Sequence, residues 1–129
     1  MNETILLMGH GSADYDGSVE FVQLVEAVRA TVPDRTVEAG FLEFAGPVLH
    51  SIQDAIDRCA ARGDEQVLAV PVLLYYAGHA KYDMPAQIRT GRERHPHLDL
   101  RAAPPLGIQV PLLEITEQRI AELEATLPP

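Results

Sequence analysis

The sequence contains few of the residues that several common classes of protein depend on. Its 129 residues include one cysteine, Cys59, and no tryptophan. A single cysteine excludes an internal disulfide and favours a reducing, cytoplasmic location. No apolar run approaches the roughly 20 residues that a membrane-spanning helix needs, and the first residues lack the basic stretch of a secretory signal. We therefore expect a cytoplasmic protein that does not insert into a membrane.

Basic residues are also scarce, with ten Lys and Arg against nineteen Asp and Glu and a net charge of −9. This balance argues against a nucleic acid or an anionic membrane as the partner, because both are bound by basic surfaces. One segment departs from this excess of acidic residues. Between residues 81 and 101 there are three acidic residues and five basic ones, which are Lys81, Arg89, Arg92, Arg94 and Arg101. These residues form either a solvated helix face or a binding surface for a polycarboxylate.

Several catalytic motifs are absent. The chain has no phosphate loop of the form Gly-x4-Gly-Lys, no Cys-x-x-Cys and no Gly-x-Ser-x-Gly nucleophile elbow. A small hydrolase that uses Ser12 as nucleophile and His10 as base remains an alternative. It is disfavoured because residues two apart in a turn rarely meet as nucleophile and base, and because no orienting acid is evident.

Apolar periodicity predicts four strands that alternate with four helices. We expect strands at residues 5–8, 36–42, 67–74 and 98–102, and helices from Asp14 or Asp16 to Pro33, from Pro47 to Gly63, from Pro85 to about Arg94, and over 111–123. This alternation indicates the α/β class, as a single three-layer domain over residues 1–129 with a four-stranded, mainly parallel sheet. Pro71 suggests a bulge or an edge position in the third strand. Cys59 lies on the apolar stripe of the second helix, so we expect it in the core.

Ligands of such sheets bind at the carboxyl ends of the strands, so the site is expected in the loops that follow them. His10 follows the first strand, Glu43 the second and His79 the third. Imidazole nitrogens and a carboxylate that converge from separate elements suit a divalent metal ion. The glycines beside both histidines let a bulky substrate approach the backbone.

Each of these residues also has a plainer interpretation. A single histidine after a strand is commonly a cap or a hydrogen-bonded loop residue. Glu43 could be an acid at the start of a helix, where the helix dipole favours it. His95 and His97 flank a proline and suit a solvated turn, although their spacing could also bind a metal.

Three motifs occur in order along the chain and together resemble the CbiX/SirB family of class II chelatases. They are Gly9-His10-Gly11-Ser12, then Phe41-Leu42-Glu43-Phe44-Ala45-x-Pro47, then Val70-Pro71-Val72-Leu73-Leu74 leading to His79-x3-Asp83-Met84-Pro85. The resemblance extends from about residue 3 to 115. The length is similar to that of the short, single-domain members, which resemble half of the larger two-domain chelatases.

The resemblance implies an enzyme of the lyase class that inserts cobalt, nickel or ferrous iron into sirohydrochlorin, within cobalamin-type or sirohaem-type tetrapyrrole biosynthesis. It implies that His10 and His79 bind the metal, that His10 also accepts protons, and that the protein is a homodimer. The metal is a substrate and no organic cofactor is expected. The residues implied to contact the tetrapyrrole are Ser12, Leu74, Tyr75, Tyr76, Ala77 and Gly78.

The sequence departs from the family pattern at three positions around these motifs. Ala13 stands where Arg is common, Gly46 where Glu is common, and Gly78 is adjacent to the second histidine instead of two residues before it. We interpret Glu43 as a further catalytic residue, either a ligand or a proton relay. The alternative function is a metal or tetrapyrrole carrier without turnover.

Overall fold

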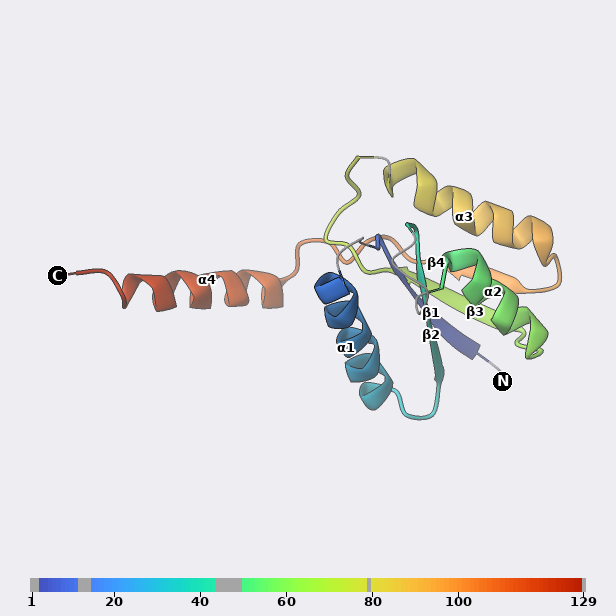
Figure 1. Cartoon of the computed structure of the whole chain (residues 1–129), viewed down its shortest axis with the longest axis horizontal. Helices are drawn as coiled ribbons and strands as arrows, with labels where there is room; N and C mark the ends of the chain where they lie inside the picture. Colours follow the sequence, from blue (N-terminus) through green and yellow to red (C-terminus); the bar gives the residue numbers. More distant parts are fainter. Residues whose placement is uncertain (1–2, 12–14, 44–49, 79, 129) are drawn as a thin grey trace.

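Four strands and four helices alternate along the chain, as the periodicity predicts (Figure 1). The computed structural model describes residues 3–11, 15–43, 50–78 and 80–128. The elements are β1 (Glu3–Gly9), α1 (Tyr15–Thr31), β2 (Thr36–Phe41), α2 (Ile52–Ala61), β3 (Gln66–Pro71), α3 (Ala80–Arg94), β4 (Asp99–Ala102) and α4 (Val110–Glu124). The strands form one sheet in the order β2-β1-β3-β4, and every pair is parallel. The α/β class and the parallel sheet are therefore confirmed.

Alternate residues of the central strands enter two separate cores, one on each face of the sheet. Leu6 and Met8 of β1 pack with the apolar faces of α2 and α3, in a core that also contains Cys59. Leu7 packs on the opposite face with Val25 of α1. Burial raises the pKa of Cys59 to about 11. The prediction that this thiol fills the core is confirmed.

The second and third helices do not begin at the prolines where the sequence predicted their starts. The second helix begins at Ile52, because Ser51 caps it and forms a capping box with Asp54. Pro47, the predicted start, lies outside the described residues. The third helix begins at Ala80, five residues before Pro85. At that position the proline removes only the hydrogen bond to the Lys81 carbonyl, close to the start of the helix, so the helix continues through it.

Pro71 occupies neither a bulge nor an edge strand, so this prediction was wrong. It is the buried last residue of β3, paired in register with Met8, and β3 lies between β1 and β4. The next residue, Val72, donates its N–H to the Met8 carbonyl of β1 at 2.8 Å. The backbone of Pro71 therefore faces β4, which ends at Ala102 before it reaches this level. The missing N–H costs no ladder hydrogen bond there.

The last helix, α4, stands apart from the sheet and the other helices (Figure 1). No residue of this helix, which is described over its whole length, is buried. The segment before it is held in place, because Leu106 and Gly107 donate to the carbonyls of Leu73 and Leu74 at 2.8 Å each. Among the helices in the described part of the chain, none is long and apolar enough to cross a membrane.

An ion-pair network closes the amino edge of the sheet. The Thr4 hydroxyl donates to Asp64 at 2.6 Å, and Arg62 donates to Asp64 at 2.7 Å and to Glu38 at 2.8 Å. Burial would raise the pKa of Asp64, but the hydrogen bonds from Arg62 and Thr4 outweigh it, so this pKa lies below its usual value. A carboxylate with a lowered pKa stabilises the fold above its unfolded pKa, and this contribution is lost as the pH falls through the folded value.

We expect Asp64→Asn to lower the free energy of unfolding by about 1–2 kcal/mol at pH 7, since it weakens charge-assisted hydrogen bonds. The difference from wild type should begin to shrink as the pH falls below about 4, where Asp64 of the unfolded chain becomes protonated, and should be lost as the pH falls through the lower pKa of the folded state. Urea unfolding at several pH values measures this. Asp34→Asn, an exposed position in the turn before β2, is the matched control and should leave stability unchanged. A difference that stays constant down to pH 3 would contradict this role of Asp64.

Candidate functional site

Backbone hydrogen bonds hold together the loops that leave the carboxyl edge of the sheet. Leu42 N–H donates to the Gly9 carbonyl at 2.9 Å, and Glu43 N–H donates to the His10 carbonyl at 2.8 Å. These bonds continue the β1–β2 ladder beyond the last paired strand residues. His10 and Glu43, two residues predicted for the site, are thus fixed side by side through the main chain.

Gly11 is required at the point where these two loops meet. Its φ is 87°, in the left-handed region that side chains other than hydrogen disfavour. A Cβ at this position would lie 2.2 Å from the carbonyl oxygen of Glu43, far closer than atoms can approach. The glycine after His10 therefore allows the close packing of the two loops.

His10 is half-buried at the end of β1. Its Nδ1 lies 3.2 Å from the carbonyl oxygen of Gly11. A neutral imidazole that donates from Nδ1 to a carbonyl carries its lone pair on Nε2, the form that binds a metal or accepts a proton. The turn that brings Gly11 against Glu43 thus also orients this ring.

Glu43 is exposed and is not the first-turn acid of α2. That role belongs to Asp54, which lies three residues after the cap Ser51. The helix-start interpretation of Glu43 is therefore wrong for α2. The main chain of Glu43 is bonded to the His10 loop, and the role of this residue as a ligand or proton relay stays a prediction.

Two of the predicted site residues, Ser12 and His79, lie outside the described residues. The described residues next to them lie at the carboxyl edge of the sheet. Gly11 precedes Ser12, and Gly78, with a φ of 57°, ends the loop after β3 just before α3 begins at Ala80. Among the described side chains, no group of three His, Cys, Asp or Glu could hold a metal ion. The pairing of His10 with His79 remains a prediction.

The predicted tetrapyrrole-contacting stretch forms the loop between β3 and α3, and its side chains differ in burial. Leu74 and Tyr75 are exposed, at 45% and 67%. Tyr76 is half-buried and packs against the core beneath α2 and α3, and burial raises its pKa. Ala77 and Gly78 are exposed. Tyr75 is thus accessible for stacking on a flat ring, whereas Tyr76 forms part of a wall.

Tyr76 borders a cavity of about 310 Å³ that the sequence did not reveal. It lies between the carboxyl edge of the sheet and α3, and is lined by Met8, Tyr76, Met84, Pro85, Ile88, Arg89, Arg92 and Ala102. The excess of basic residues in the 81–101 segment was the only sign of it. The apolar lining comes from four separate parts of the chain, namely β1, the loop between β3 and α3, α3 and β4, so no local pattern predicts it.

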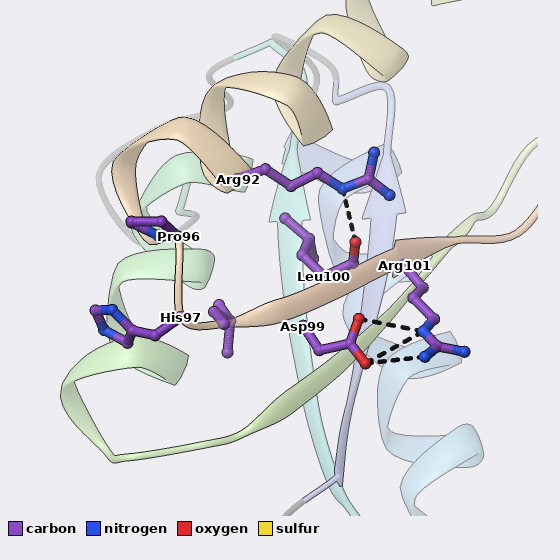
Figure 2. A pocket seen from close by; sticks show the side chains of 7 residues that line it. Arg92, Pro96, His97, Asp99, Leu100 and Arg101 are labelled. Atoms are coloured by element: carbon purple, nitrogen blue, oxygen red, sulfur yellow. Dashed lines mark hydrogen bonds and ion pairs between the residues drawn. The ribbon is translucent and has the colours of Figure 1, made fainter.

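The histidines around Pro96 form no metal site of their own. His95 Nε2 lies 2.8 Å from an Asp57 carboxylate oxygen, and Arg94 also pairs with Asp57 at 2.8 Å. His97 is exposed at the rim of a second hollow, which lies along the outer edge of β4 between Arg92 and Arg101 (Figure 2). The interpretation of this segment as a solvated turn agrees with these contacts.

Comparisons with known proteins identify similar chains. The family model described as CbiX matches residues 4–123. A sirohydrochlorin cobaltochelatase of Priestia megaterium is 34% identical over 121 residues, which are 93% of this chain and 38% of that protein. The chain spans less than half the length of each of the first three curated relatives it matches, at 38%, 44% and 46%.

Two solved structures show the same fold. SirB from Bacillus subtilis, solved with Fe3+, is 28% identical with a TM-score of 0.85, and the match covers 99% of this chain and 49% of that one. A CbiX protein from Marinobacter aquaeolei VT8 is 29% identical with a TM-score of 0.78, and the match covers 96% of this chain and 99% of that one. A chain of this length therefore matches one such protein end to end.

The contact between Gly11 and Glu43 predicts unequal effects of two glycine substitutions. Both Gly11→Ala and Gly78→Ala place a side chain at positive φ, which costs about 1 kcal/mol. Gly78 has nothing within 4 Å of the added Cβ, whereas Gly11 has the Glu43 carbonyl at 2.2 Å. We expect Gly11→Ala to lower the free energy of unfolding by about 2 kcal/mol more than Gly78→Ala, because overpacking adds its own cost. Urea unfolding of both variants measures the difference, and equal losses would contradict the close packing.

Proposed function

This chain belongs to the CbiX family, and we propose that it is a chelatase that inserts a divalent metal ion, Co2+, Ni2+ or Fe2+, into sirohydrochlorin. The observation that carries the proposal is the junction of the His10 and Glu43 loops at the carboxyl edge of the sheet, with Glu43 N–H on the His10 carbonyl. The names of the relatives supply the macrocycle and two of the metals. The same step would serve cobalamin-type or sirohaem-type tetrapyrrole biosynthesis.

Metal insertion exchanges two protons for one metal ion. Two pyrrole N–H protons leave the ring, the metal loses its other ligands, and four metal–nitrogen bonds form with no change of oxidation state. A neutral imidazole serves both halves of this exchange near pH 7, because it binds borderline metals and accepts protons. We assign these roles to His10, with His79 as the second metal ligand. Two or three protein ligands leave coordination positions open for the incoming pyrrole nitrogens.

Glu43 acts beside His10 as a third ligand or as the group that passes protons to solvent. Its exposure suits the second role, because a relay must reach water.

We place the macrocycle over the loop between β3 and α3, where Tyr75 stacks on it. The other proposed contacts in this region are Ser12, Leu74, Tyr76, Ala77 and Gly78. No organic cofactor takes part in the proposed reaction. The cytoplasmic location expected from the single cysteine stays a prediction.

We also propose that the protein works as a homodimer joined by α4. Four apolar side chains fall on one face of this helix, namely Leu112, Leu113, Ile120 and Leu123, and the last three are 51–68% exposed. On the sheet face that α1 covers in part, Leu68 and Val70 of β3 stay half-buried. A second copy of the chain offers the α4 stripe a matching apolar surface. The resemblance to short, single-domain chelatases supports the same assembly.

An anaerobic insertion assay tests the chelatase. Purified protein is mixed with sirohydrochlorin and Co2+, Ni2+ or Fe2+, and the macrocycle absorbance is followed against the rate without protein. We expect His10→Ala and His79→Ala each to lower kcat/KM by about 100-fold or more, since each removes a metal ligand and His10 is also the base. His97→Ala, an exposed histidine in the turn after α3, should match wild type.

Other outcomes of this assay distinguish the alternatives. Full activity in both histidine variants would overturn the chelatase proposal. Metal or macrocycle binding without insertion would identify a carrier instead. Hydrolysis of an ester by the wild type that Ser12→Ala alone abolishes, with no metal insertion, would favour the hydrolase. Glu43→Gln separates the two roles of that residue, because a lost ligand weakens metal binding whereas a lost relay slows insertion at saturating metal.

The dimer is tested with two equally exposed residues of α4. Ile115 and Ile120 are each 51% exposed, but they are five residues apart and so point about 140° away from one another around the helix. We expect Ile120→Glu to raise the dimer dissociation constant at least about tenfold, and Ile115→Glu to leave it unchanged. Analytical ultracentrifugation over a range of concentrations measures both. A wild-type protein that is monomeric at all concentrations would contradict the assembly.

A further inference from the structure

The cavity under α3 combines an apolar floor with a charged rim. Met8, Met84 and Ile88 form the floor and are 0–3% exposed. Tyr76 forms one wall, and Arg89 and Arg92 of α3 form the rim. Met8, the second-last residue of β1, and Tyr76 place one end of the cavity near the carboxyl edge, where His10 follows β1. The cavity extends along α3 to Arg92, which lies beside Leu100 of β4.

These two arginines differ from all the others in the chain. In the described part of the structure, Arg89 and Arg92 pair with no carboxylate. The remaining seven arginines each form an ion pair with Asp or Glu, and they are Arg29, Arg35, Arg58, Arg62, Arg94, Arg101 and Arg119. In a protein with nearly twice as many acidic as basic residues, leaving two neighbouring guanidinium groups without an acid requires an explanation.

Arg92 is held in a fixed position. Its Nε donates to the Leu100 carbonyl of β4 at 2.8 Å, and its two terminal nitrogens bond to none of the other residues drawn in Figure 2. The nearby acid, Asp99, is engaged by Arg101 at 3.1 Å instead. Arg89 lies three residues earlier on α3, about one turn away, so the two side chains share a helix face. The pair thus presents a positively charged edge beside apolar side chains, with Arg92 held in place by β4.

We propose that Arg89 and Arg92 bind carboxylate groups at the rim of the tetrapyrrole, while part of its ring lies against Met8, Met84, Ile88 and Tyr76. The inference rests on the proposed function, since it assigns a subsite for the same substrate. Sirohydrochlorin carries carboxylates around a flat conjugated ring, and planar guanidinium groups bind carboxylates with two parallel hydrogen bonds. The two arginines select macrocycles rich in carboxylates and fix the orientation of the ring relative to His10.

Direct binding measurements test this subsite without metal insertion. The affinity for sirohydrochlorin, and for porphyrins with eight and with two carboxylates, is measured by the fluorescence or absorbance of the macrocycle. We expect Arg89→Gln and Arg92→Gln each to weaken binding of sirohydrochlorin and of the octacarboxylate about tenfold, with a smaller effect on the dicarboxylate. Arg89→Lys should recover part of the affinity, because it keeps the charge and loses only the two-pronged geometry.

Arg35→Gln is the matched control, because it removes the same charge at the amino edge of the sheet, where Arg35 pairs with Glu3 at 3.1 Å. It should bind all three macrocycles as wild type does. Thermal unfolding shows whether Arg92→Gln also lowers stability, because this variant loses the hydrogen bond to Leu100 as well. Arg89 makes no such bond.

In the insertion assay, the Arg89 and Arg92 variants should raise KM for sirohydrochlorin about tenfold with kcat little changed.

The outcomes separate this inference from the proposed function. If wild type inserts metal and Arg89→Gln binds every macrocycle like Arg35→Gln, the subsite is wrong and the chelatase stands. If wild type inserts no metal but binds carboxylate-rich macrocycles through Arg89, the subsite stands and the chelatase proposal fails. An effect of equal size on the porphyrins with eight and two carboxylates would also overturn carboxylate recognition.

Discussion

The position of β1 between β2 and β3 is the constraint on which the rest of this structure depends. A central parallel strand must release its carboxyl end between the ends of its neighbours, and the backbone continues to bond beyond the ladder on both sides. Leu42 donates to Gly9 on one side, and Val72 donates to Met8 on the other. His10 therefore leaves the sheet within a fixed frame of main-chain atoms. The proposed metal chemistry needs this rigidity, because a ligand displaced by 1 Å loses much of its effect.

The arginines of this protein fall into two groups, those that pair with carboxylates and those that do not. At the amino edge, Glu38, Arg62 and Asp64 satisfy one another through short ion pairs and hydrogen bonds. Along α3, which runs back from the carboxyl edge towards the start of β4, Arg89 and Arg92 form no ion pair with a carboxylate in the described part of the chain. Charges that neutralise each other stabilise the fold, whereas charges left without partners near a cavity are available to a ligand. This division explains how a protein with a net charge of −9 offers a surface to an anionic substrate.

The sequence predicted those features that depend on local pattern. Strand ends are visible where apolar runs stop, so His10 and Glu43 could be assigned to the correct edge. The start of α2 was misplaced, because Pro47 was given more weight than the capping box of Ser51 and Asp54. The Arg89–Arg92 cavity could not be predicted, since its floor joins Met8 of β1 to Met84 and Ile88 of α3. Which arginines lack partners is equally non-local, because Arg94 pairs with Asp57, 37 residues away.

The central place of β1 also determines the order in which the molecule can be assembled. Thr4 pairs with Thr36 on one side and with Val67 on the other, so the first strand synthesised gains its second neighbour only when residues 66–71 have been made. Closing such large loops costs entropy before any contact compensates for it, and topologies of this kind fold slowly. The strand that carries His10 thus waits longest for its neighbours. On the ribosome, the loops around this histidine can come together only after the chain has emerged past β3, so the proposed active centre is among the last parts to form.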